Sequence, residues 1–212
     1  VEENCHNCTA SIDFHIRDRL EQDLGSDPSL LSVFKAKNVT FETISANVKL
    51  AISGGQNEPR DAIAGTIATL LQNPNQLEKI FNGEFDWLKA FEEYARWMSP
   101  IGMSPRRIAK DFLYKDFNFF ENDRVFLMFG SANRDEEIFE NAEKFKLDRN
   151  LARAISFGAG PHFCAGAWIS KTLIAEVAIP MIFEKFPSIK LLSGVEYFGW
   201  AFRGPKPFFV KL

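Results

Sequence analysis

One cysteine stands in a segment whose residue types could hold a metal ion. Residues 157–166 read FGAGPHFCAG and lead directly into a predicted helix. The glycines allow backbone N–H groups to approach a neighbour closely, and the start of a helix offers positive potential to Cys164. Both effects favour the thiolate form of Cys164. A thiolate held by N–H groups is suited to ligating iron.

Taken without its surroundings, Cys164 has three interpretations. A lone cysteine before a buried helix is ordinarily a structural thiol. A nucleophilic cysteine needs a positioned base, and His162, only two residues away, is expected to point elsewhere. A ligand to iron is the third interpretation, and the motifs elsewhere in the chain decide for it.

Glu93 and Arg96 form a second pair with a chemical implication. They lie three residues apart in a predicted helix, so both side chains share one helix face and can form an ion pair. By itself this spacing is ordinary for an ion pair on a helix surface.

The elements that must position these residues are mostly helices. Apolar residues at helical spacing predict helices over residues 1–24, 40–73, 75–81, 85–97 and 165–185. Short alternations rich in Phe, Val and Tyr predict strands within residues 106–131 and 195–212, while residues 132–157 look irregular. The fold class is therefore mainly α with small β-sheets.

Composition and charge exclude several classes of protein. With 212 residues, of which 46% are hydrophobic, the chain can bury a core, and residues 1–212 are expected to form a single unit. The net charge of −3 and the scattered basic residues leave no electrostatic footprint for nucleic acid. The longest apolar stretch, Thr172–Phe183, contains Glu176 and Pro180 and is too short to span a bilayer, so no membrane segment is expected.

Several short motifs occur in one order along the chain. Ser99 and Pro100 follow the Glu93 and Arg96 pair, residues 132–135 (ANRD) and 145–149 (FKLDR) precede the cysteine loop, and residues 198–204 (FGWAFRG) follow it. Together with Phe-x-x-Gly-x-His-x-Cys-x-Gly at 157–166, this series resembles the cytochrome P450 family in its soluble bacterial form. The resemblance covers nearly the whole chain and implies the C-terminal, haem-binding portion of the P450 fold.

The resemblance implies roles for the residues around the cysteine. Cys164 would be the axial ligand to the iron of haem b, and Arg106 and His162 would hold the haem propionates. Phe157 would pack near the sulfur and help to exclude water. The haem-binding loop would also include Gly158 and Gly166.

The resemblance also gives a structural role to the ion pair. Glu93 and Arg96 would hold the core beneath the haem. Lys144 stands where the family often carries an arginine, and it could join this network with less bidentate geometry.

The long helix over residues 40–73 departs from the family at its centre. In the resemblance, Gly54, Gly55 and Glu58 border the oxygen groove, and Asn57 with Glu58 replaces the family's acid and threonine. Pro59 lacks an N–H and crowds the carbonyl of Gly55, so a defect in the middle of the helix is expected. We hypothesise that Glu58 relays protons.

The alternative for Glu58 is purely structural. In that interpretation its carboxylate pairs with Arg60 or with another cation.

Cys5 and Cys8 have the spacing of half a zinc site, but no second Cys/His pair follows them. Covalent haem attachment requires a histidine at the position of Thr9. Two thiols on one helix face is therefore the preferred interpretation. Three cysteines make no disulfide framework, which fits a reducing cytoplasm.

The resemblance implies an activity and its partners. The family inserts one oxygen atom from dioxygen into an apolar organic substrate, using iron activated by its axial thiolate. The chain shows no flavin or iron–sulfur motif, so electrons would come from a ferredoxin and its NAD(P)H-dependent reductase. The ferredoxin would dock near Arg153 and Lys171. The substrate would be small and apolar, and the enzyme cytoplasmic.

The length of the chain leaves two further interpretations open. Measured against the family, the N-terminal half that supplies most of the substrate pocket is expected to be absent. The chain is then either a monooxygenase or a truncated or degenerate homologue that binds haem without turnover. A non-haem protein with Cys164 as its nucleophile is the remaining alternative.

Overall fold

The fold is mainly helical with small two-stranded sheets, as the sequence predicts. The computed structural model describes residues 2–25 and 28–212. The chain divides into two compact units, Val1–Asn57 and Glu58–Leu212. The expectation that residues 1–212 form one haem-binding unit stays a prediction.

The first unit contains helices α1 (Glu2–Glu21) and α2 (Leu30–Ala36) and the beginning of α3 (Phe41–Gln72). The Asp13 carboxylate of α1 accepts hydrogen bonds from Ser45 Oγ and Lys49 Nζ of α3, both at 2.6 Å. The hydrogen bond from Lys49, then that from Ser45, holds the pKa of Asp13 below its ordinary value. The apolar pattern indicates no helix over residues 29–39, yet Ser29 caps α2 there by accepting from the Ser32 N–H.

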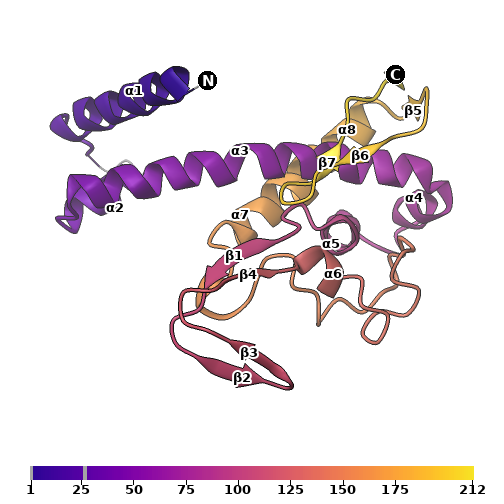
Figure 1. The fold of residues 1–212 in the computed structure, drawn as a ribbon. Coiled ribbons are helices and arrows are strands. Elements are labelled where there is room, and N and C mark those ends of the chain that lie inside the picture. Colours follow the sequence, from indigo (N-terminus) through magenta and orange to yellow (C-terminus); the bar gives the residue numbers. More distant parts are fainter. Residues whose placement is uncertain (1, 26–27) are drawn as a thin grey trace. The chain divides into compact units, whose positions relative to one another are not determined.

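The helices of the second unit pack around a shared apolar core. They are the rest of α3, α4 (Pro74–Phe81), α5 (Trp87–Met98), α7 (Ala167–Lys171) and α8 (Ile179–Lys185), with a π-helical segment, η2 (Thr172–Ala178), between α7 and α8 (Figure 1). The side chains buried between these helices include Leu70, Phe91, Tyr94, Ile174 and Ile179. The predicted helix over residues 165–185 is therefore present, although its centre is a π helix.

The position of the π segment has a physical reason. Pro180 has no N–H, and its ring crowds the carbonyl of the residue four positions earlier, Glu176. The wider turns of η2 end two residues before Pro180. A π segment inside a longer helix relieves such crowding by changing the hydrogen-bond spacing.

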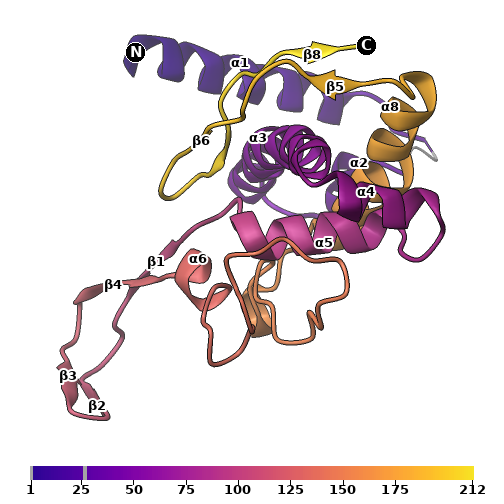
Figure 2. The ribbon, with the colours of Figure 1, turned by 90° about the vertical axis from the view of Figure 1, so that its right-hand side faces the viewer.

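Four antiparallel strand pairs complete the second unit. They are β1 (Ser104–Arg107) with β4 (Arg124–Leu127), β2 (Phe112–Tyr114) with β3 (Phe117–Phe119), β5 (Lys190–Leu191) with β8 (Val210–Lys211), and β6 (Tyr197–Phe198) with β7 (Gly204–Pro205). A short helix, α6 (Phe129–Ala132), follows β4. The β2–β3 hairpin projects away from the helices of this unit in both ribbon views (Figures 1 and 2). Both regions predicted to form strands do so.

The long helix α3 runs through the predicted defect without a break. It is helical from Phe41 to Gln72, with Pro59 inside it. Gly54 and Gly55 are therefore helical residues, and the defect expected near Pro59 does not interrupt the helix.

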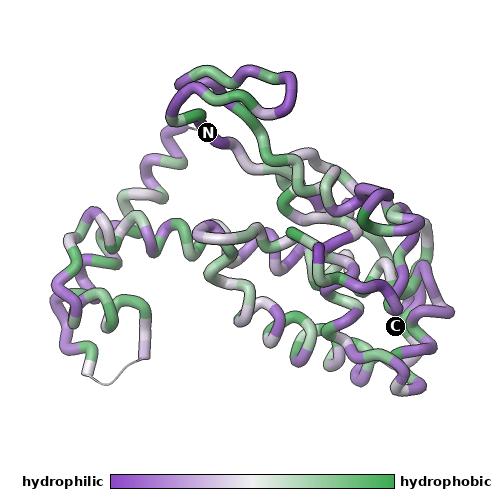
Figure 3. Tube along the Cα trace, turned by 90° about the horizontal axis from the view of Figure 1, so that it is seen from below, coloured by the Kyte–Doolittle hydropathy of each residue, from purple (hydrophilic) through white to green (hydrophobic). Residues whose placement is uncertain are grey.

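Hydrophobic and hydrophilic residues interleave along the trace (Figure 3). Among the described residues, no helix is long and apolar enough to cross a membrane.

Gly65 of α3 and Tyr94 of α5 make a close contact between two helices of the second unit. A Cβ added at Gly65 would overlap the Tyr94 hydroxyl and ring. Tyr94 is fully buried, and this burial raises the pKa of its hydroxyl well above the ordinary value. The ring has no room to retreat, so Gly65 sets the spacing of the two helices.

Replacing Gly65 with alanine tests this spacing. We expect Gly65→Ala to lower the free energy of unfolding by about 1–3 kcal/mol, because the added methyl group overpacks a closed contact. The matched control is Gly54→Ala, where a Cβ meets nothing within 4 Å. The control should be neutral or stabilise the helix by roughly 0.5–1 kcal/mol. Urea unfolding of the three proteins measures both effects, and equal midpoints would contradict the expectation.

Candidate functional site

The cysteine loop is a compact turn closed by its own backbone. The Cys164 N–H donates to the Phe157 carbonyl at 2.8 Å, and the Phe163 N–H donates to the Gly160 carbonyl at 3.0 Å. Gly158 and Gly160 have φ of +71° and +61°, a region that favours glycine. The loop therefore brings the backbones of Phe157 and Cys164 together, and the packing of the Phe157 ring near the sulfur stays a prediction.

Cys164 lies at the start of the helix that begins with α7. The Ala167 N–H donates to the Cys164 carbonyl at 3.2 Å, and a Cβ added at Gly166 would lie 3.8 Å from the Cys164 sulfur. The thiol is free and exposed. An accessible sulfur at a helix start is the arrangement that a thiolate ligand requires.

The neighbouring loop residues differ in burial. His162 is exposed, at the end of the single 3-10 turn Gly160–His162. Phe157 is half-buried, with its ring centroid 6.1 Å from that of Phe91 in an edge-to-face contact. Phe157 thus anchors the loop to the core, and His162 remains available to a ligand.

Arg106 lies outside the loop, on β1. Its Nη1 donates to Ser104 Oγ at 2.7 Å and to the Pro105 carbonyl at 2.8 Å. No ion pair of Arg106 is found in the part of the chain that the structure describes. Its guanidinium therefore keeps donors that an anion could accept.

Glu58 has one carboxylate oxygen, Oε2, that is buried and without a hydrogen-bond partner among the described residues. Among the described residues Arg60 Nε donates to Asp61 Oδ1 at 2.9 Å, and the structural alternative, in which Glu58 pairs with Arg60 or with another cation, stays a prediction. This hydrogen bond raises the pKa of Arg60. A buried carboxylate oxygen without a hydrogen bond is destabilising, so a donor to Glu58 Oε2 would have to come from outside the described residues.

The remaining residues of the predicted oxygen groove belong to the first unit. Gly54, Gly55 and Asn57 lie on the exposed surface of α3. Their proximity to Cys164 stays a prediction.

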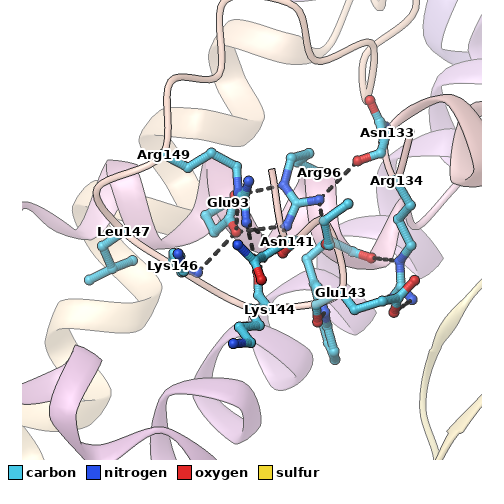
Figure 4. A network of polar contacts seen from close by, with 12 residues as sticks. Glu93, Arg96, Asn133, Arg134, Asn141, Glu143, Lys144, Lys146, Leu147 and Arg149 are labelled. Carbon is cyan, nitrogen blue, oxygen red and sulfur yellow. Dashed lines mark hydrogen bonds and ion pairs between the residues drawn. The ribbon is translucent and has the colours of Figure 1, made fainter. Parts of the chain in front are cut away.

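The Glu93 and Arg96 pair is buried completely, which the helical spacing alone does not reveal. Both side chains have no exposed surface, and the pair is bidentate, with Arg96 Nε to Glu93 Oε2 at 2.8 Å and Arg96 Nη2 to Glu93 Oε1 at 2.7 Å (Figure 4). Arg96 also donates to the carbonyls of Asn133, Ala142 and Lys144. Its charge is therefore matched and its donors are used.

Arg149, rather than Lys144, supplies the second cation. Arg149 Nε lies 3.2 Å from Glu93 Oε1, and its side chain is 6% exposed. Its other nitrogens donate to the carbonyls of Glu140, Asn141 and Lys144. The Lys144 side chain is exposed, so only its backbone joins the network and the predicted role for its ammonium group is wrong. The signal for Arg149 was its place in the FKLDR motif.

Asn133 connects the ion pair to the cysteine loop. Its carbonyl accepts from Arg96, its Nδ2 donates to Ser99 Oγ at 2.9 Å, and its Oδ1 accepts from the Ile155 N–H at 2.8 Å. Ile155 stands two residues before Phe157. A fully buried side chain thus fixes the chain just before the loop.

Lys171 and Arg153, the two cations predicted to contact a ferredoxin, differ in their exposure and in their partners. Lys171 is 25% exposed, its Nζ lies 2.6 Å from Glu92 Oε1, and it stacks over the Phe157 and Trp168 rings. Arg153 is exposed. Lys171 therefore already has an anionic partner, and Arg153 is the freer of the two cations.

The network predicts a large and specific loss of stability when Glu93 is removed. We expect Glu93→Ala to lower the free energy of unfolding by about 3–5 kcal/mol, because two buried guanidinium groups lose their counter-ion. Lys144→Ala is the matched control and should change it by less than about 0.5 kcal/mol, because that side chain is exposed. Denaturant unfolding followed by tryptophan fluorescence compares the two, and equal losses would show that the buried pair contributes nothing special.

Comparison with known proteins places this geometry in a family. The family model described as "Cytochrome P450" matches residues 88–191, which include α5, the ion-pair network and the cysteine loop. The chain is 38% identical over 138 residues to the polyketide biosynthesis cytochrome P450 PksS of Bacillus subtilis, which is 65% of this chain and 34% of that protein. It is 32% identical over 169 residues to the biotin biosynthesis cytochrome P450 of Bacillus subtilis, which is 80% of this chain and 41% of that protein.

A solved structure indicates the same family as the sequence relatives. The crystal structure of P450BioI in complex with an acyl carrier protein ligated to hexadec-9Z-enoic acid superposes with a TM-score of 0.85 and 27% identity. The match covers 96% of this chain and 53% of that chain, so this chain spans about half the length of the structure it matches. Family model, relatives and fold agree, and the chain belongs to the cytochrome P450 family.

Proposed function

We propose that this chain is the haem-binding part of a haem-thiolate monooxygenase, in which the Cys164 thiolate is the axial ligand to the iron of haem b. The observation that carries the proposal is the free, exposed Cys164 thiol at a helix start, in a loop closed by the hydrogen bond from Cys164 to Phe157. A thiolate ligand must be accessible on one side and anchored on the other.

The residues around the loop fit a haem. His162 is exposed and Arg106 keeps unused donors, so each could hold a propionate. The Phe157 ring, packed on Phe91, would shield the sulfur from water. Gly158 has a positive φ, and a Cβ added there would lie 3.1 Å from the His162 carbonyl oxygen, so a glycine suits this turn of the loop.

Bound haem would supply the activation of dioxygen, from which one oxygen atom is inserted into the substrate. The protein's own part is to hold the sulfur, exclude water and deliver protons. Glu58, with its buried and unsatisfied Oε2, is the residue we assign to proton delivery, and Asn57 precedes it on α3. Glu93 and Arg96 support the cysteine loop through Asn133, which accepts hydrogen bonds from Arg96 and from the Ile155 N–H.

The substrate and the partners that we propose rest on the family to which the chain belongs. We propose a small apolar substrate, and the acyl chain carried by the partner of P450BioI is one example of that class. Electrons would come from a ferredoxin and its NAD(P)H-dependent reductase in the cytoplasm, with Arg153 as the freer docking cation.

A second candidate function rests on the centre of α3. Asn57 and Glu58 replace the family's acid and threonine, so the chain could bind haem without turnover. Substrate-dependent NADH consumption with an added redox chain separates this candidate from the monooxygenase.

The ligand assignment is tested by absorption spectroscopy of the haem-reconstituted chain, reduced and exposed to carbon monoxide. We expect a strongly red-shifted Soret band, because a thiolate ligand pushes electron density onto the iron. Cys164→Ala should abolish this band, while the control Cys8→Ala, which removes an exposed thiol of the first unit, should keep it. The spectrum of a histidine-ligated haem in the unmodified chain would refute thiolate ligation.

The role of Glu58 is tested by the coupling of electron use to product. We expect Glu58→Gln to lower product formed per reducing equivalent several-fold, because an amide cannot relay a proton. The control Glu136→Gln changes an exposed carboxylate in the same way and should leave coupling unchanged. Unchanged coupling in Glu58→Gln would leave that carboxylate with a structural role only.

A further inference from the structure

The ammonium group of Lys171 contacts three elements of the second unit. Its Nζ lies 2.6 Å from Glu92 Oε1 of α5 and 5.8 Å from the centroid of the Phe157 ring, which belongs to the cysteine loop. It also lies 5.6 Å from the centroid of the Trp168 ring, about one turn earlier in α7. A single charged group therefore joins α5, the cysteine loop and the start of the helix that follows the loop.

These contacts are partly shielded from water. The side chains of Lys171 and Glu92 are 25% and 29% exposed, so their ion pair is screened less than a pair on the open surface. A cation within about 6 Å of an aromatic centroid is attracted by the negative face of the ring, and the attraction grows as water is removed. An ammonium group has three N–H donors, so the pair with Glu92 does not exhaust its interactions. Glu92 thus fixes the position of the charge next to the two rings.

The loop residue that the ammonium group contacts is also the one that holds Cys164. The Cys164 N–H donates to the Phe157 carbonyl at 2.8 Å, and the Phe157 ring makes an edge-to-face contact with Phe91. Phe91 precedes Glu92 in α5, so the same helix holds the ring directly and through Lys171. Two contacts therefore restrain the ring of the residue whose carbonyl accepts the hydrogen bond from Cys164.

A second lysine of the same unit makes a similar contact without joining two elements. Lys185 Nζ lies 5.6 Å from the centroid of the Phe186 ring, nearly the same distance as in the contacts of Lys171. Phe186 is the next residue along the chain, so this contact is local. What distinguishes Lys171 is therefore the set of elements that it connects, because the distance to the ring is the same in both cases.

We propose that Lys171 is a positioning residue of the cysteine loop. Its ammonium group, held by Glu92, restrains Phe157 and with it the hydrogen bond that fixes the Cys164 backbone. This internal role is distinct from the docking role that the sequence predicts for Lys171. Its relevance to catalysis rests on the proposed function, because a metal ligand needs a fixed support. The contacts themselves require neither haem nor an electron donor.

Amide hydrogen exchange of the full chain without haem tests this role. We expect Lys171→Met, which keeps an unbranched side chain and removes the charge, to speed exchange of the Cys164 amide about two- to fivefold, the factor that a cation–π contact contributes. Lys171→Arg should restore slow exchange, because a guanidinium group keeps the charge and its attraction to a ring. The amide of Leu70, a core residue of α3, should exchange at one rate in all variants, because it reports global unfolding.

Two further variants separate positioning from charge. Lys185→Met removes the same charge from the local contact and should leave exchange at Cys164 unchanged. Lys171→Met/Glu92→Gln removes both partners without changing the net charge of the chain, and exchange at Cys164 should stay fast. If Lys171→Met unfolds the chain, Glu92→Gln alone is the milder variant. It frees the ammonium group without removing it and should also speed exchange at Cys164.

Four results would overturn the proposal. They are unchanged exchange at Cys164 in Lys171→Met, equal acceleration in Lys185→Met, an equal acceleration at Leu70, and slow exchange restored in the double variant. The last result would mean that only the net charge matters. Exchange is measured without haem, and the carbon monoxide spectrum of the unmodified chain reports ligation separately. A failure of positioning is therefore distinguishable from a failure of the proposed function.

Discussion

The second unit depends on one buried charge, the carboxylate of Glu93. A carboxylate without exposed surface is destabilising unless cations and donors surround it, and here Arg96 and Arg149 do so together with the Lys146 N–H. The two arginines then direct their remaining donors at carbonyls of residues 133–144, a stretch with little regular structure. These carbonyls of the irregular stretch therefore accept hydrogen bonds from arginine side chains, where a helix or a sheet would supply backbone N–H groups.

Two sets of contacts connect the Glu93 network and its helix to the cysteine loop. Asn133 accepts from Arg96 and from the Ile155 N–H, which fixes the chain before the loop. Phe157 packs on Phe91, which belongs to the same helix as Glu93. Hydrogen bonds through Asn133 and ring packing through Phe157 therefore hold the loop in place, while the Cys164 sulfur stays exposed. This combination of a rigid support and an accessible ligand is what a metal site needs.

The helix after Cys164 connects the cysteine loop to the core of the second unit. It begins directly after the loop, and one of its faces completes the core with Ile174 and Ile179. The π segment belongs to this buried face as well, because it contributes Ile174 and Ala175 to the core. Leu173 and Val177 of the same segment are exposed.

Local patterns in the sequence determined the fold class, the short strands, the cysteine loop and the helix that carries Glu93 and Arg96, because periodicity and spacing report contacts between near neighbours. Helix α2 was missed because a seven-residue helix is too short for a clear period. Only the tertiary structure decided that the Glu93 pair is buried and that Arg149 rather than Lys144 completes it. The same is true of Glu58 Oε2, which is buried without a hydrogen-bond partner among the described residues. Arg149 lies 56 residues from Glu93, and burial and pairing at such separations depend on packing between elements, which no local pattern encodes.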